Sequence, residues 1–508
     1  MILHNFIKHH GNVQNWFAVG FVVIVLALSP SLASAQAPKR NIVLLVSDDH
    51  SPDLGVYGNP VIQTPNLDAL ANDGVIFNNA YATTASCSAS RSVILSGLQN
   101  HRNGQYGHYH DFHRFLTWDH IKTLPVLLRE GGYRTARAGK FHVGTEETYS
   151  FDETLPSPER CSVIMAEGIS DFINEKDERP FFLYFATNDP HRGARRKDDG
   201  TIAGLDDVDT PDDFGNLSEG ASNIDNISYD PADVIVPDFL PDTPMTRIEL
   251  AAYYQAVSRM DKGFGKVIEI LKKSGKYDDT LIIYMSDHGI AFPGAKTTTY
   301  DAGLNAPLIV RHPDKAKRGT QNDAMISWVD ITPTILDFAG LAEPSYNMQI
   351  MLTPISQQME ETHGLHGRSF LSVLDQTQPE GWDEIYASHT FHEIQMYYPM
   401  RVVRGRKYKL IWNIAHDLPY PAAADLWESP TWQRIYRQGG ETMFGPRTVD
   451  EYMHRPEFEL FDIENDPLES NNLAYDPVYS EILEVHKTKI REFQRTTQDP
   501  WLLKWTYE

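Results

Sequence analysis

Three short runs of apolar residues, each ending in a polar cluster, limit the folds open to this chain. The runs cover residues 41–46, 181–186 and 281–285. None of them alternates polar and apolar residues, which is typical of strands that are buried on both faces. Segments with helical character lie between them. The pattern therefore predicts strands at the centre of an α/β sheet.

Acidic and imidazole side chains follow each of the three runs. Open α/β sheets place their ligands beyond the carboxyl ends of the strands. We therefore expect these side chains to converge on one site. They are Asp48, Asp49, Asp189, His191, Asp287 and His288.

Proline near a helix start and glycine after its end mark several helices. Thr64-Pro65 opens a helix that ends at Gly74, and Leu124-Pro125 opens one that ends at Gly131-Gly132. A longer helix is predicted over residues 246–274, and another opens at Thr332-Pro333.

With 508 residues, the chain is too long to form a single hydrophobic core of ordinary size. Its character changes after about residue 377, where residues 385–410 show the aromatic and β-branched runs typical of strands. Residues 479–494 are predicted to form a helix. We therefore predict a larger α/β domain over residues 36–377 and a smaller α+β domain over residues 378–508.

The stretch from residue 193 to residue 243 is rich in Asp, Gly and Pro and lacks periodicity. We expect a long surface loop at the rim of the site. Asp206, Asp207 and Asp209 could suggest a calcium loop, but their spacing fits no EF-hand pattern. A solvated loop is therefore favoured there.

The N-terminal residues are typical of an export signal. Lys8 precedes an apolar run over residues 16–28, and small residues follow at 33–35. The run is shorter than the roughly 20 residues that span a bilayer, so we expect cleavage after Ala35 rather than a membrane anchor. An exported protein with only two cysteines, Cys87 and Cys161, can keep one for chemistry. A disulfide between them stays open as the alternative.

The composition excludes two classes of partner. With 41% hydrophobic and 22% charged residues the chain is globular, and its net charge is −24. Such a surface repels nucleic acid and anionic lipid, so we expect neither nucleic acid nor membrane as a partner. A site for an anionic substrate must then be basic locally.

One motif and its surroundings identify a family. Cys87-Ser88-Ala89-Ser90-Arg91 resembles the signature of the formylglycine sulfatases, and alone it would be a weak signal. The other elements of that family occur in the same order along the chain: Asp48-Asp49, Gly139-Lys140 with His142, His191, and Asp287-His288 with Lys296.

The resemblance is closest to the sulfamidase (heparan N-sulfatase) branch and runs almost end to end. The stretches that carry it are NGQYG at Asn103, RPFFLYFATNDPHR at Arg179, YDPADVIVPDFLPDTP at Tyr229, SDHGIAFP at Ser286, HEIQMYYPMR at His392 and TQDPW at Thr497. It implies an alkaline-phosphatase-like sandwich with a central mixed, mostly parallel sheet. It also implies a smaller C-terminal α+β domain with an antiparallel sheet.

The resemblance also implies a cofactor set. A maturation enzyme would oxidise Cys87 to formylglycine (3-oxoalanine), whose hydrate attacks sulfur. Ala89 stands where proline is commoner, which leaves open which maturation enzyme acts. Ca²⁺ would be held by Asp48, Asp49, Asp287, His288 and the modified Cys87. Imidazole prefers transition metals, but three carboxylates favour calcium.

Individual roles follow from the same likeness. Arg91 would hold the diol, and Lys140 and Lys296 the sulfate oxygens. His142 would be the base and His191 the acid that protonates the leaving group. Further candidates for contacts with the sugar are Asp111, His113, His392, Glu393 and Arg401; for the last three, a place in a domain interface is an equal alternative.

The predicted activity is therefore hydrolysis of a sulfate group from a sulfated oligo- or polysaccharide, with the N-sulfate of glucosamine as first choice. An O-sulfatase for another polysaccharide, such as an algal one, is the runner-up. A phosphate or phosphonate hydrolase of the same superfamily, and a non-catalytic glycan-binding protein with an unconverted Cys87, are further alternatives.

Overall fold

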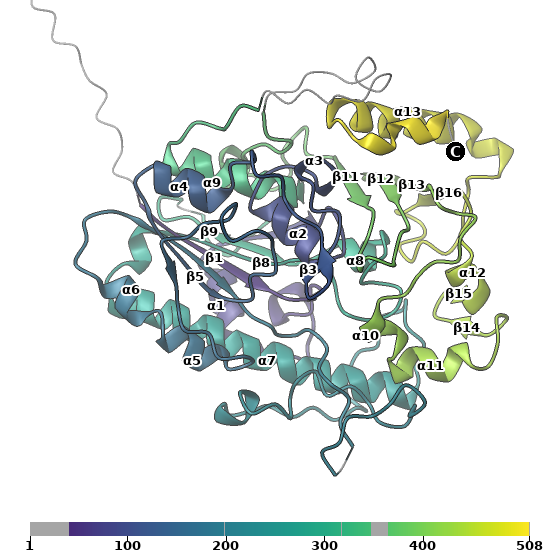
Figure 1. The fold of residues 1–508 in the computed structure, drawn as a ribbon, viewed down its shortest axis with the longest axis horizontal. Helices are drawn as coiled ribbons and strands as arrows, with labels where there is room; N and C mark the ends of the chain where they lie inside the picture. The colour runs from purple at the N-terminus through teal and green to yellow at the C-terminus, as the bar shows by residue number, and fades with distance from the viewer. Residues whose placement is uncertain (1–39, 198, 316, 347–363, 507–508) are drawn as a thin grey trace, which may run out of the picture. The chain divides into compact units, whose positions relative to one another are not determined.

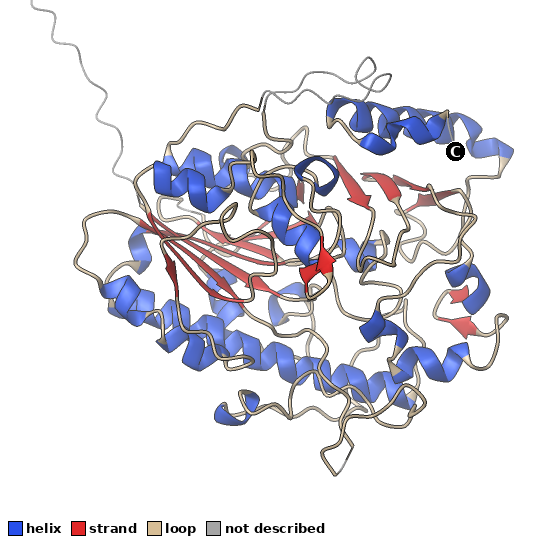
Figure 2. Ribbon diagram, in the orientation of Figure 1, coloured by secondary structure: helices blue, strands red, loops and turns tan. Residues whose placement is uncertain are grey.

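The computed structural model describes residues 40–197, 199–315, 317–346 and 364–506. An eight-stranded sheet forms the centre of this part of the chain (Figures 1 and 2), and its strands run in the order β10-β2-β9-β8-β1-β7-β5-β6. All pairings are parallel except those of β9, which is antiparallel to β2 and β8. The prediction of a mixed, mostly parallel sheet is confirmed. The strands are β1 (Asn41–Ser47), β2 (Val75–Tyr81), β5 (Arg134–Gly139), β6 (Glu153–Thr154), β7 (Phe181–Ala186), β8 (Thr280–Ser286), β9 (Leu308–Arg311) and β10 (Thr320–Ser327).

The three apolar runs form adjacent strands at the middle of the sheet. Every residue of β1, β7 and β8 is buried. Along β1, Val43 and Leu45 belong to one core cluster, and Ile42, Leu44 and Val46 belong to the other. Because successive side chains of a strand point to opposite faces, the run is apolar throughout only if both faces are covered.

Helices cover both faces of the sheet and make the predicted sandwich (Figures 1 and 2). The long helix α7 begins directly after Thr243, whose side chain accepts a hydrogen bond from the backbone N–H of Thr246. One face carries α1 (Pro65–Asn72), α5 (Ser162–Glu167), α6 (Ser170–Asn174) and α7 (Pro244–Lys273), and the other carries α2 (Cys87–Ile94), α4 (Leu124–Glu130) and α9 (Ile331–Ala339).

A second, antiparallel sheet follows in the C-terminal part. It confirms the predicted C-terminal antiparallel sheet. Its order is β11-β12-β13-β16, with β11 (Glu384–His389), β12 (Met400–Gly405), β13 (Tyr408–Asn413) and β16 (Phe458–Asp462). Helix α13 (Ser480–Thr496) covers one face (Figure 1). Residues on the other face, such as Val402 and Ile411, join a core cluster of the central sheet. The domain boundary at residue 377 stays a prediction.

The remaining helices and strands are short. They are α3 (Asn100–Asn103), β3 (Tyr109–His110), β4 (His113–Arg114), α8 (Asp301–Leu304), α10 (Ala424–Trp427), α11 (Pro430–Tyr436), β14 (Met443–Phe444), β15 (Arg447–Thr448) and α12 (Val449–Met453).

The predicted loop over residues 193–243 contains little regular structure, chiefly the 3₁₀ turn η2 (Ala221–Asn223). Its Asp206 and Asp209 form ion pairs with Arg437 and Arg434 at the end of α11. Because two of the loop's acids are paired with arginines, a solvated loop is favoured over a calcium-binding loop.

Other sequence predictions differ from the structure or fall outside it. Cys87 and Cys161 are both free, so the disulfide alternative is wrong. The predicted signal peptide and its cleavage position lie outside the described residues. Within the described part of the chain, no helix combines the length and the apolar character that crossing a bilayer requires.

Candidate functional site

The site lies at the carboxyl ends of β1 and β8, which are paired in parallel register from Asn41 to Ser47. Asp48, Asp49 and Asp287 follow these strands and are completely buried. The backbone N–H of Asp49 donates to Oδ1 of Asp287 at 3.0 Å. Strand pairing therefore brings together acids that are far apart in the sequence.

Cys87, the first residue of α2, points into this acidic end of the sheet. Its Sγ lies 3.5 Å from Oδ1 of Asp49 and 3.4 Å from Nε2 of His288. The candidate ligand atoms of Asp49, Cys87, Asp287 and His288 all lie within 4.8 Å of one another, and the four residues are buried. We call these four residues the acidic group. Two buried carboxylates and an imidazole fit a divalent cation, and the carboxylates favour a hard one.

Arg91 links the two strand ends one helical turn after Cys87. Its Nε donates to Asp287 at 2.9 Å and its Nη2 to Asp48 at 3.0 Å. The second oxygen of Asp48 accepts a bond from Nζ of Lys140 at 2.5 Å. Both Asp48 oxygens are thus engaged by cations, so its predicted part in metal binding stays a prediction.

Lys296 also contacts the acidic group. Its Nζ is 2.8 Å from Oδ2 of Asp49, 3.1 Å from Nε2 of His191 and 2.8 Å from Oδ2 of Asp425. Asp425 belongs to α10 and was missed by the sequence analysis, because nothing in its surroundings forms a motif.

The protonation states of the side chains in the site favour the binding of an anionic substrate. Burial opposes the charge of Lys296, but Asp425 and Asp49 hold its pKa well above the usual value. Burial, helped by Lys296, lowers the pKa of His191 to about 4, so this imidazole is neutral near pH 7. Burial raises the pKa of the Cys87 thiol, so the unmodified residue is a poor nucleophile.

Strained backbone also marks the site. Asp49, His142 and Thr297 have φ angles of 59°, 58° and 65°. Non-glycine residues in this left-handed region cost free energy and cluster at functional sites. Thr297 follows Lys296 directly, so each of these three residues is a predicted site residue or its neighbour.

Two cavities open beside the site. One of about 750 Å³ is lined by Asp48, Lys140, His191 and Arg196, among others. A second of about 490 Å³ is lined by Tyr109, His110, Lys140 and His142, among others. Lys140 borders both cavities and offers an ammonium group to an anionic substrate; acidic and basic side chains are balanced in the two linings, so a locally basic pocket stays a prediction.

Some predicted sugar contacts lie near the site and others do not. Nδ1 of His392 is 3.0 Å from the hydroxyl of Ser86, the residue before Cys87. Nδ1 of His113 accepts a bond from the N–H of Ile394 at 3.1 Å, so its role is structural at that atom.

The other three candidates are less suitably placed. The carboxylate of Asp111 is exposed beside its neighbour His110, and the side chain of Glu393 pairs with Gln395 near the surface. Arg401 is completely buried, and its Nε pairs with Asp499 at 2.5 Å. Burial therefore favours the interface alternative for Arg401.

Comparisons with known proteins agree with this geometry. Residues 40–341 match the sulfatase family, and residues 294–438 match the family described as N-sulphoglucosamine sulphohydrolase, C-terminal. The chain is 38% identical to N-sulphoglucosamine sulphohydrolase of Homo sapiens over 94% of each protein. It is 28% identical to an ulvan-active sulfatase of Formosa agariphila over 89% of this chain and 79% of that protein.

Solved structures share the fold. A structure described as a complex with its substrate D-glucosamine-2-N,6-O-disulfate has a TM-score of 0.63, 21% identity, and coverage of 91% of this chain and 99% of that one. The phosphonate monoester hydrolase of Agrobacterium radiobacter has a TM-score of 0.61, 19% identity, and coverage of 90% and 95%. The family match extends over more than half of the sequence and includes every catalytic and metal-binding residue predicted above, so the chain belongs to the sulfatase family.

Proposed function

We propose that this sulfatase is a sulfamidase, which hydrolyses the N-sulfate of N-sulfated glucosamine. The observation that carries the proposal is the 38% identity to N-sulphoglucosamine sulphohydrolase over nearly the full length of both proteins. The match of residues 294–438 to the C-terminal family of that enzyme supports it. This segment includes Lys296 and Asp425, which border the site.

Sulfatases of this family generally use a formylglycine and a divalent metal, and the acidic group has room for both roles. We propose that a formylglycine-generating enzyme oxidises Cys87 and that Asp48, Asp49, Asp287 and His288 hold Ca²⁺. The hydrated aldehyde would supply a hydroxyl nucleophile for sulfur. The calcium ion would supply positive charge against the sulfate oxygens.

The chain's own residues would position the sulfate. The ammonium group of Lys140 pairs with Asp48 and that of Lys296 pairs with Asp49, so both lie beside the acidic group. These two ammonium groups can bind sulfate oxygens without moving far. The first turn of α2 adds the positive end of a helix dipole at Cys87.

Two histidines can move protons. His191 is neutral in the free site, and a bound sulfate beside Lys296 would raise its pKa again, because an anion favours the imidazolium. It could then protonate the leaving nitrogen. Burial and Lys140 hold the pKa of His142 well below its usual value, so His142 is ready to accept a proton.

Measuring released sulfate tests the substrate. We expect hydrolysis of N-sulfoglucosamine at a kcat/KM at least about tenfold above that of O-sulfated glucosamine, galactosamine or ulvan fragments, since one unsuited polar contact costs at least this much. A preference for any O-sulfated sugar would favour the runner-up activity instead. A higher rate on aryl phosphate than on aryl sulfate would contradict both.

Replacing Cys87 tests the nucleophile. We expect Cys87→Ala to lower kcat at least roughly a thousandfold while the thermal unfolding midpoint changes little, because the change is small at the edge of the site. Cys161→Ala is the matched control, since that thiol is also buried and free. Intact-mass analysis should show that Cys87 of the active enzyme has lost its sulfur. Full activity in Cys87→Ala would rule out the assignment.

We also propose export after cleavage behind Ala35, on the basis of the basic start, the apolar run over residues 16–28 and the small residues at 33–35. N-terminal sequencing of protein from the extracytoplasmic fraction should begin at Gln36. An intact Met1 in that fraction would contradict cleavage.

A further inference from the structure

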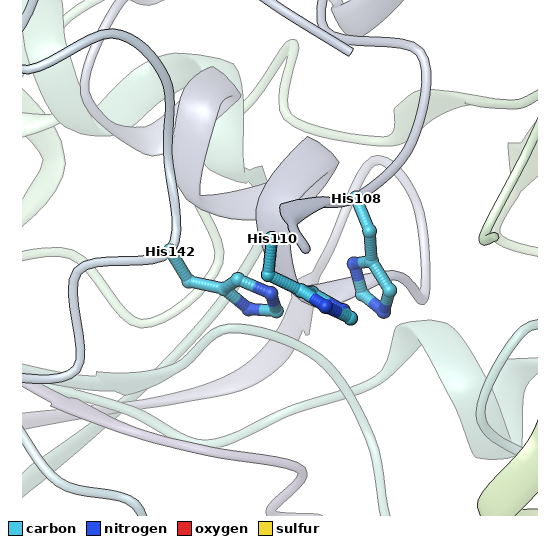
Figure 3. A group of neighbouring side chains, drawn as sticks. All are labelled: His108, His110 and His142. Atoms are coloured by element: carbon cyan, nitrogen blue, oxygen red, sulfur yellow. The ribbon is translucent and has the colours of Figure 1, made fainter. Parts of the chain in front are cut away.

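Three histidines form a cluster beside the acidic group. His108 directly precedes β3, His110 is the last residue of β3, and His142 follows β5 (Figure 3). Their ring centroids lie 4.7–5.0 Å apart, and their candidate ligand nitrogens all lie within 4.8 Å of one another. We call these three residues the histidine cluster. Figure 3 shows the three rings gathered at one place although they come from two separate segments.

Two nitrogens of the cluster are buried without a partner. In the described part of the structure, Nδ1 of His108 and Nδ1 of His142 make no hydrogen bond. The side chain of His108 belongs to a residue that is only 5% exposed. Buried polar atoms are nearly always paired, so two unpaired ring nitrogens in one place indicate a missing partner.

The contacts of His108 are compatible with the tautomer that a metal ligand needs. Nε2 of His108 lies 2.9 Å from Nε2 of His392, and Nδ1 of His392 lies 3.0 Å from the hydroxyl of Ser86. When Nε2 of His108 carries the proton, it donates to His392, which in turn donates to Ser86. Nδ1 of His108 then has a free electron pair. Histidines that bind metals commonly donate their other N–H in this way.

Two members of the cluster, His108 and His142, are held in the neutral form, which can bind a cation. Burial lowers the pKa of both His108 and His142 well below the usual value, with neighbouring positive groups adding to the effect. Only a neutral imidazole can bind a metal. The nearest ammonium groups, those of Lys140 and Lys296, are paired with Asp48 and Asp49. Their charge therefore opposes a cation less than that of free lysines would.

We propose that the histidine cluster is a binding site for a transition-metal ion of the Zn²⁺ type, separate from the acidic group, and that its occupation inhibits the enzyme. Imidazole nitrogens suit Zn²⁺, Cu²⁺ and Ni²⁺, whereas Ca²⁺ and Mg²⁺ require oxygen ligands. The three residues offer nitrogen alone, so the two sites select different metals.

The geometry allows the site to close. Nitrogens bound to tetrahedral zinc at about 2.0–2.1 Å lie roughly 3.3 Å from one another. The candidate nitrogens lie within 4.8 Å of one another, so small side-chain rotations would bring them to that spacing, and His110 is only partly buried. His110 and His142 line the cavity of about 490 Å³, which leaves the fourth position open to water.

The inhibitory part rests on the proposed function. A metal on Nδ1 or Nε2 of His142 occupies the ring that is proposed to accept a proton. Occupation of the cluster should then stop turnover without displacing Ca²⁺. The binding part does not depend on any activity, so the two can fail separately.

Zinc binding to the calcium-saturated full chain without a histidine tag tests the site. Competition with a chromogenic chelator at pH 7.5 should show one Zn²⁺ per chain that excess Ca²⁺ does not displace. His110→Ala should weaken binding at least tenfold, and His108→Gln should do so as well if its fold is intact by circular dichroism. His454→Ala is the control, since that side chain is exposed and distant in sequence.

The outcomes separate the hypotheses. Unchanged zinc affinity in His110→Ala, or displacement of Zn²⁺ by Ca²⁺, would overturn the site. If zinc binds as expected but does not inhibit sulfate release by the wild type, the regulatory part is wrong. Zinc binding in a chain without sulfamidase activity would leave the site standing and remove only the proposed function.

Discussion

At the scale of single residues, each lysine of the site forms an ion pair with an aspartate. Lys140 pairs with Asp48, while Lys296 lies between Asp49 and Asp425. A lysine held by two carboxylates keeps its charge even when buried, which is what binding a sulfate oxygen requires. Oδ2 of Asp425 lies 2.8 Å from Nζ of Lys296 and 3.9 Å from Nε2 of His191, so Asp425 acts through these two side chains and we regard it as a positioning residue.

Asp425→Asn tests that role. Removing the charge should let Lys296 leave its place, and we expect kcat to fall about 10–100-fold with a smaller change in KM, as for other residues that orient a catalytic group. The steady-state kinetics of sulfate release provide the measurement. Asp417→Asn, in the same segment with its carboxylate 95% exposed, should behave like wild type. Equal losses in both variants would mean that Asp425 only stabilises the fold.

At the scale of elements, short segments connect distant parts of the chain. Helix α2 places Cys87 and Arg91 one turn apart, so one faces the acidic group while the other joins β1 to β8. In the C-terminal part, Arg401 of β12 pairs with Asp499 just after α13, and Gln494 donates to the same carboxylate at 2.9 Å. This buried pair attaches the last helix to the sheet.

The Arg401–Asp499 pair predicts a pH dependence of stability. Burial would raise the pKa of Asp499, but Arg401 holds it well below the usual value. A carboxyl whose folded-state pKa is depressed stabilises the protein above its unfolded pKa of about 4, and this contribution is lost as the pH falls.

Asp499→Asn should therefore lower the free energy of unfolding at pH 7 by about 3–5 kcal/mol, because Arg401 remains buried without its partner. The difference from wild type should shrink in urea unfolding at pH 3. Glu484→Gln, which removes an exposed pair with Lys487, should change the free energy by less than about 1 kcal/mol. A pH-independent difference would show that the pair is not the cause.

At the scale of the whole molecule, the acidic group joins segments from the first, second and sixth tenths of the chain. Asp49 follows β1, Cys87 opens α2, and Asp287 and His288 follow β8. A cation that binds all of them exists only in the folded protein, so its binding free energy adds to the stability of the fold.

Calcium removal should therefore destabilise the protein. At a hundredfold excess over Kd the ion should contribute about 2.7 kcal/mol, and EGTA should lower the thermal unfolding midpoint by a few degrees. The scans are compared at one rate and one protein concentration. Restoring Ca²⁺ should recover the midpoint, whereas Mg²⁺ at equal ionic strength should recover less. No shift with EGTA would contradict the calcium assignment.

The central sheet and most of the site could be predicted from local sequence. An apolar run such as that of β1 requires cover on both faces, and parallel strands end at one edge, so Asp48, Asp49 and Asp287 had to meet. The family motif then indicated that Cys87 lies beside them. These predictions succeed because each depends on neighbours in the sequence or on one general rule of sheets.

The tertiary structure alone decided which other side chains reach the site. Asp425 comes to Lys296 because the C-terminal part shares a core with the central sheet, and no local pattern encodes that packing. Within the C-terminal part, the packing of α13 on its sheet buries Arg401 against Asp499. Within the α/β part, the fold brings His108 and His142 together from two segments. Contacts between distant segments depend on how whole surfaces pack together. No local pattern in a single sequence predicts them.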